Sequence, residues 1–219
     1  MALSKLQYNS LNVTPSASKG IRFNSGANGF EAASAGGNLT LIKTTALASA
    51  AASISFVNGS SDVVLDSTYK EYIFLINNIH PSVNNAHFLF QGSVDTGSNY
   101  GVNITSSAFS TEHNEADSST DLSYQTSVDL AQSTNFQRIT SSGSHNNDDC
   151  SVGILHLFEP SSTTFVKHFI ITGNTVADAY TVGTHIAGYF NSTSAIDAIQ
   201  FKMASGNIDV GTISLYGVV

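Results

Sequence analysis

The chain has 219 residues, of which 41% are hydrophobic and only 11% are charged, against roughly a quarter in a typical globular domain. Its net charge is −8, and its eight Lys and Arg residues form no cluster, which excludes nucleic-acid binding through phosphates and membrane attachment by a basic face. A single cysteine, Cys150, excludes an intrachain disulfide and the class of disulfide-stapled secreted modules.

The sequence shows no route out of the cytoplasm. It begins without an apolar stretch of signal-peptide length, and no window approaches the roughly 18 apolar residues of a membrane helix. We therefore expect a protein that is made and assembled in a cytoplasm, without membrane insertion. Because so few residues are charged, Ser, Thr, Asn and Gly must cover most of the surface. Such a surface suits a protein that buries much of itself against other subunits.

Residues 1–38 differ in composition from the rest of the chain. Gly, Ser, Asn and Ala dominate this segment. Its apolar residues are few and isolated: Leu6, Leu11, Val13, Ile21, Phe23 and Phe30. This segment cannot bury enough apolar surface to fold alone. The pattern predicts an extended N-terminal arm that lies along another chain, inserts its apolar side chains singly and gains backbone hydrogen bonds by strand addition.

From residue 39 to residue 219 the sequence repeats short runs rich in β-branched and aromatic residues, separated by Gly, Asn, Ser and Asp. They predict strands at Leu39–Thr44, Ser53–Val57, Tyr69–Ile79, Ala86–Gln91, Tyr100–Phe109, Ser123–Leu130, Phe136–Thr140, Ser151–Phe158, Thr164–Thr172, His185–Phe190, Ala195–Met203 and Thr212–Tyr216. The alanine-rich TTALASAAASI favours a helix by propensity, but it runs directly into SISFV, so a helix is the lesser alternative.

Strands without helical spacers predict an all-β, antiparallel β-sandwich over residues 39–219, and a jelly roll is the leading architecture at this length. No internal repeat indicates a propeller or a solenoid. In Ser151–Phe158, SVGILHLF, both faces of the strand are apolar. We therefore expect this strand to be buried on both sides or to lie under a contact between subunits.

The sequence offers no clear chemistry. No metal-binding or nucleophile motif and no phosphate-binding glycine motif is present, and the seven histidines are spread over His80, His87, His113, His145, His156, His168 and His185. Acidic residues accompany histidine only in the segments Glu112–Asp117 and His145–Asp149. We expect these to be solvent-exposed loops, with a bound cation as the alternative. We predict no enzyme activity and no catalytic, cofactor-binding or metal-ligating residue.

Four stretches carry a resemblance to known proteins: SKLQYNSLNVTP, SDVVLDSTYKEYIFLINNIHP, LHLFEPSSTTFVKHF and AIQFKMASGNIDVGTISLYGV. They resemble small structural proteins of tailed phages that infect marine bacteria and cyanobacteria. The resemblance covers most of the chain and is weakest from about Ser93 to Asp149. Its motifs are structural rather than catalytic, so it implies a virion component and supplies no site residues.

The resemblance implies a non-enzymatic virion protein, an exposed appendage subunit of a tail fibre or head fibre that docks on other virion proteins through its arm. A capsid decoration protein that stabilises the head, and a sugar-binding, lectin-like domain, are the alternatives. By analogy with phage fibres, and because the chain carries little charge, we expect a homotrimer. The exposed part would then be available to a glycan or protein of the host surface.

Overall fold

We describe a computed structural model of the chain, which places residues 19–34 and 38–218. The chain divides into two units, Met1–Asn38 and Leu39–Val219, and each is considered by itself. Every regular element in the described residues is a β-strand; no helix forms there, and hence none that could cross a membrane.

The described part of the N-terminal unit is a β-hairpin. Strand β1 (Lys19–Phe23) pairs antiparallel with β2 (Phe30–Ser34), so that Phe23 lies opposite Phe30. The two rings stack with their centroids 4.9 Å apart. On the neighbouring pair, Arg22 donates to Glu31 at 2.8 Å. An isolated two-stranded hairpin is marginally stable in water, so these cross-strand contacts are its main internal support.

The sequence predicted an extended arm over residues 1–38, and this hairpin is the part of it that the structure describes. Pairing within the hairpin leaves only the outer edges of β1 and β2 for hydrogen bonds to a neighbour. Three of the predicted anchor residues remain on its surface, since Ile21, Phe23 and Phe30 are 50%, 67% and 44% exposed. The other three, Leu6, Leu11 and Val13, lie outside the described residues.

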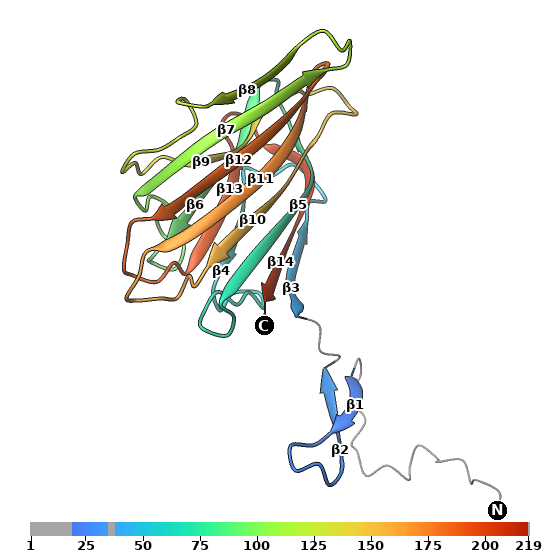
Figure 1. The fold of residues 1–219 in the computed structure, drawn as a ribbon, viewed down its shortest axis with the longest axis vertical. Helices are drawn as coiled ribbons and strands as arrows, with labels where there is room; N and C mark the ends of the chain where they lie inside the picture. Colours follow the sequence, from blue (N-terminus) through green and yellow to red (C-terminus); the bar gives the residue numbers. More distant parts are fainter. Residues whose placement is uncertain (1–18, 35–37, 219) are drawn as a thin grey trace, which may run out of the picture. The chain divides into compact units, whose positions relative to one another are not determined.

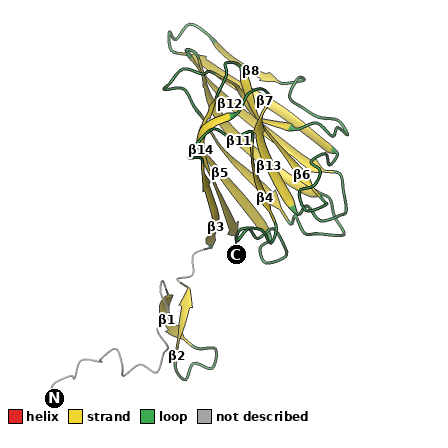
Figure 2. Ribbon diagram, turned by 180° about the vertical axis from the view of Figure 1, so that it is seen from behind, coloured by secondary structure: helices red, strands yellow, loops and turns green. Residues whose placement is uncertain are grey.

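The second unit is an antiparallel β-sandwich, as the sequence predicted. Its strands are β3 (Leu39–Ala46), β4 (Ser53–Val57), β5 (Glu71–Pro81), β6 (Ala86–Ser93), β7 (Ile104–Asn114), β8 (Thr120–Tyr124), β9 (Gln137–Gly143), β10 (Ser151–Phe158), β11 (Lys167–Ala177), β12 (Tyr180–Phe190), β13 (Ala198–Met203) and β14 (Ile208–Val218). Eight of them form a large sheet in the order β3-β14-β5-β10-β11-β12-β7-β8, which can be followed in Figure 1. The other four form a small sheet in the order β4-β13-β6-β9, and Figure 2 shows β4, β13 and β6 from behind.

The connectivity is that of a jelly roll with an insertion. From β4 to β7 the chain alternates between the two sheets, and the strand orders β4-β13-β6-β9 and β5-β10-β7-β8 would give two four-stranded jelly-roll sheets. The hairpin β11–β12 is inserted between β10 and β7, and β14 and β3 extend the large sheet beyond β5. These additions double the large sheet and leave the small sheet at four strands.

One predicted strand is largely wrong. Ser123–Leu130 overlaps β8 only at Ser123 and Tyr124, and the following residues form a turn in which the amides of Val128 and Asp129 both donate to the carbonyl oxygen of Gln125. Val128 lies in this turn, and its side chain is buried in the hydrophobic core. An apolar residue that fills the core from a loop gives the same sequence signal as a short strand.

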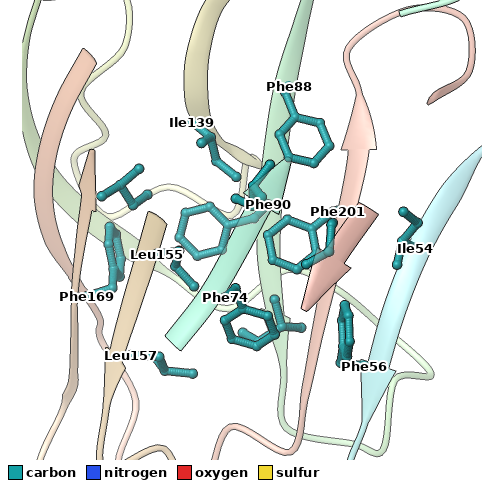
Figure 3. Packing of buried hydrophobic residues seen from close by; sticks show 14 of the residues in the cluster. Ile54, Phe56, Phe74, Phe88, Phe90, Ile139, Leu155, Leu157, Phe169 and Phe201 are labelled. Carbon is teal, nitrogen blue, oxygen red and sulfur yellow. The ribbon is translucent and has the colours of Figure 1, made fainter. Parts of the chain in front are cut away.

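Aromatic rings fill the space between the two sheets. Phe201 on β13 lies at the centre of this core, with its ring 5.3 Å from that of Phe74 on the large sheet, 5.8 Å from Phe88 and 6.1 Å from Phe56. All four side chains are buried, and Figure 3 shows them between the strands. The inward faces of the two sheets therefore pack against each other. The opposite, outer face of the large sheet takes no part in this packing.

Candidate functional site

The outer face of the large sheet consists of the side chains that point away from the small sheet. Strand β11 shows the alternation, since residues at odd positions from Lys167 to Thr175 are buried and those between them are exposed. On the four central strands the outward residues include Ile73 and Leu75 of β5, Val152, Ile154, His156 and Phe158 of β10, His168, Ile170 and Thr172 of β11, and His185, Ala187 and Tyr189 of β12. No element of the described residues 38–218 covers them.

Strand register gathers the apolar members of this face into one continuous surface. Ile154 lies between Leu75 and Thr172, and Ile170 lies between His156 and Ala187. Ile154 is 40% exposed and Ile170 is 48% exposed. The surface continues to the edge of the sheet, where Phe109 of β7 faces Tyr124 of β8. A contiguous apolar surface of this kind on the outside of a folded domain indicates an interaction site.

This outer face carries almost no charge. On the four central strands β5, β10, β11 and β12, Glu71 is the one carboxylate among the outward residues, and neither Lys nor Arg occurs there. Glu71 accepts a hydrogen bond from Nδ1 of His156 at 2.5 Å. His185 presents its ring flat against Phe109, with centroids 4.8 Å apart. His185 therefore extends the apolar surface, whereas His156 is paired with Glu71.

Two shallow hollows mark the outer face. One, of about 420 Å³, lies over β5, β10 and β11 and is lined by Leu75, Val152, Ile154 and Thr172 among others. The second, of about 250 Å³, lies over β11, β12 and β7 beside Phe109 and Ile170, and Thr172 also lines it. Their walls are mainly apolar, and no set of acid, base and nucleophile converges on either. The arrangement can receive apolar side chains of a partner but offers no reaction chemistry.

The histidines and acidic loops singled out in the sequence lie in separate places, except that His80 adjoins the loop at residues 145–149, with its Nε2 3.0 Å from the carbonyl oxygen of Asn146. His156, His168 and His185 belong to the outer face, whereas His113 lies at the end of β7, 3.0 Å from Asp117. No group of three His, Cys, Asp or Glu side chains is arranged around a common point in the described residues. The segment at residues 112–117 is largely exposed.

The second acidic loop, at residues 145–149, is not exposed throughout as the sequence predicted. His145, Asn147 and Asp148 are exposed as predicted, but Asp149 is only 8% exposed and accepts a hydrogen bond from Asn146 at 3.1 Å. The side chain of Asp149 folds back under the loop, which the sequence pattern did not indicate.

One buried charge was missed in the sequence. Lys167 at the start of β11 is fully buried, and its Nζ donates to the carbonyl oxygens of Ser192 at 2.9 Å and Ser194 at 2.6 Å. Burial lowers the pKa of this amine. The sequence did contain a sign of this burial. In an alternating strand, Lys167 lies on the same face as Phe169 and Ile171, and that face points inward. The lysine anchors the loop between β12 and β13 to the core.

Replacing Lys167 with methionine is expected to destabilise the fold by about 1–2 kcal/mol, because the partly buried hydrogen bonds to the carbonyl groups of Ser192 and Ser194 are lost. Urea denaturation followed by circular dichroism measures the change. Lys70→Met is the matched control: its ion pair with Glu159 is exposed, so the substitution should alter stability by no more than about 0.5 kcal/mol. Equal stabilities of the two variants would contradict the anchoring role.

Comparison with models of protein families, with curated proteins and with solved structures gives no match to this chain.

Proposed function

We propose that this chain is a non-enzymatic structural subunit that assembles with copies of itself through the outer face of the large sheet. The observation that supports the proposal is the contiguous, nearly uncharged apolar surface centred on Ile154 and Ile170. The prediction that Ser151–Phe158 lies under a subunit contact agrees with its outward side chains, since Val152 and Ile154 remain 39% and 40% exposed in the single chain.

The size of the outer face suits a stable contact between subunits. Its eight strands have 5 to 11 residues each; at about 3.3 Å per residue and about 4.8 Å between strands, they give a surface of roughly 1,200 Å². A standard interface buries about 800 Å² on each partner. Covering this face would therefore provide enough apolar burial for a permanent assembly, at about 25 cal/mol for each Å² removed from water.

A second copy of the chain is the partner that best fits the charge of this face. The whole chain has a net charge of −8, which would oppose association through most other surfaces. On the four central strands of the outer face, the single carboxylate, that of Glu71, is already paired with His156. Two or three copies can therefore meet there without bringing like charges together, whereas a charged partner would find nothing complementary.

The assembly that we propose is a virion appendage of a tailed phage, a homotrimeric tail or head fibre subunit that docks on other virion proteins through its N-terminal arm. The exposed Ile21, Phe23 and Phe30 of the arm hairpin provide the apolar contacts for docking. A decoration protein of the capsid is the alternative placement. A map of the intact particle distinguishes the two, because density for the sandwich would lie on the tail or head fibre in one case and on the capsid shell in the other.

The self-association is tested by sedimentation of the full-length protein and of a chain that begins at Asn38, both at micromolar concentration. We expect trimers in both cases, because the outer face lies wholly within the sandwich. If the full-length protein is a monomer, the proposal is wrong. If only the truncated chain is a monomer, the arm, and not the sheet, holds the copies together.

The role of the arm is tested separately in particle assembly. We expect the chain that begins at Asn38 to fold, to form trimers and to be absent from purified virions, because it lacks the docking hairpin. Quantitative mass spectrometry of the particles measures the incorporation. Incorporation of the truncated chain at the level of the full-length chain would exclude docking through the arm.

A further inference from the structure

The sandwich has a second hollow of a different kind, in which polar groups gather. It has a volume of about 400 Å³, and its lining includes His80, Asp148, Asp149, Cys150 and Asp209. Three carboxyl groups, one imidazole and one thiol thus border one small space, and no Lys or Arg lines it. This combination of side chains is the one that binds zinc-class metal ions in proteins.

Bulges in neighbouring strands bring these residues together. Near the end of β5, Asn78 and Ile79 interrupt the register with β14, and the register between β5 and β10 shifts at the same level. Asn78 also adopts a positive φ of 51°. A bulge changes the direction in which the following side chains point. Here it places His80 beside the loop that carries Cys150 and beside Asp209 of β14.

His80 is held in one tautomer without a partner for its second nitrogen. Its Nε2 lies 3.0 Å from the carbonyl oxygen of Asn146, which can only accept, so Nε2 carries the proton. In the neutral ring, Nδ1 is then an acceptor. This atom is buried without a hydrogen-bond partner, and its nearest polar neighbour is Oδ2 of Asp209 at 3.5 Å. Two acceptors therefore face each other in a side chain that is only 9% exposed.

The distance between these acceptors suits a shared metal ion. Two ligands that each lie about 2.1 Å from a tetrahedral zinc ion are about 3.4 Å apart. Metal-bound histidines also donate their other ring nitrogen to a backbone carbonyl or a carboxylate, as Nε2 of His80 does to Asn146. We propose that His80 Nδ1 and Asp209 bind a divalent transition-metal ion of the zinc class, with Cys150 as third ligand and water or Asp148 as fourth.

Metal binding would require only the more exposed ligand side chains, such as that of Cys150, to move. The third ligand is not in place in this conformation, in agreement with the absence of a preformed three-residue cluster in the described residues. Cys150 is partly exposed, and its Sγ makes only a long contact of 3.8 Å with Asn78. Rotation of this side chain would bring its sulfur into the hollow. The ion would then tie the loop at residues 145–150 to β5 and β14.

The proposal is tested on tag-free, full-length protein that has been treated with a chelator and then titrated with zinc or cobalt(II). We expect one ion per chain, a higher midpoint of thermal unfolding, and with cobalt a near-ultraviolet absorption band from the thiolate. Asp209→Asn and Cys150→Ser should each weaken zinc binding tenfold or more, and Cys150→Ser should abolish the band.

Asp62→Asn is the matched control, since it removes an exposed carboxylate that does not line the hollow and should leave zinc affinity unchanged. Circular dichroism of each variant establishes that it is folded before titration. A wild-type protein that binds neither ion, or an Asp209→Asn variant that binds zinc as tightly as the wild type, would overturn the proposal.

Discussion

The double variant Ile154→Glu/Ile170→Glu is expected to be a folded monomer. Both side chains point outward on adjacent central strands of the large sheet and are 40% and 48% exposed, so a single sandwich accommodates glutamate at both positions. In the proposed trimer, the same carboxylates would be buried without a partner. Each unpaired buried charge opposes association by about 3–5 kcal/mol, which is two orders of magnitude or more in the dissociation constant.

Sedimentation velocity at micromolar concentration measures this effect, and circular dichroism shows whether the sandwich is intact. Val94→Glu is the matched control, because Val94 is 43% exposed and follows β6 of the small sheet, away from the outer face. The control should remain a trimer. A trimer of the double variant would mean that the copies meet through another surface.

Replacing Phe201 with alanine is expected to reduce the free energy of unfolding by about 3–5 kcal/mol, because the ring is lost from the centre of the core and the cavity is only partly refilled. Phe201 is fully buried and lies within 5.3–6.1 Å, between ring centroids, of Phe56, Phe74 and Phe88. For a chain of this length, the change corresponds to a decrease of roughly 6–20 °C in the unfolding midpoint.

Thermal unfolding followed by circular dichroism measures this decrease. The protein concentration must be held constant, because assembly makes the midpoint depend on concentration. Phe165→Ala is the control, since Phe165 is 68% exposed in the loop before β11 and should change stability by no more than about 0.5 kcal/mol. If the two variants unfold at the same temperature, the core is not centred on Phe201.

The sequence was sufficient to predict the sandwich because alternation within a strand is a local property. Ser53–Val57 and Ser151–Phe158 begin and end where the sequence placed them. The inserted hairpin was recognised only as separate runs, and its strands β11 and β12 are longer than predicted, since polar residues such as Asn174 and Thr181 continue the ladder at their ends. Backbone pairing, which needs no apolar side chain, extends a strand beyond its apolar run.

The candidate site was only partly predictable. The two apolar faces of Ser151–Phe158 indicated an unusual strand, but its neighbours Ile73 and Ile170 could not be deduced, because strand order is set by contacts between segments that are far apart in the sequence. The hollow at His80 was even harder to predict from the sequence. Its formation depends on bulges in β5 and β14, and a single inserted residue leaves no clear signal in the alternation.

The position of β14 in the large sheet has a consequence for synthesis. This strand lies between β3 and β5, so the β3 edge has no partner until Ile208–Val218 has left the ribosome. Pairing of such distant segments makes folding slow, and an incomplete chain exposes unpaired strand edges and the aromatic core. A chain that lacks Ile208–Val218 should therefore be more prone to aggregation and proteolysis than a chain that contains it. The order of strands thus makes the last-synthesised strand of the sandwich a requirement for closing its large sheet.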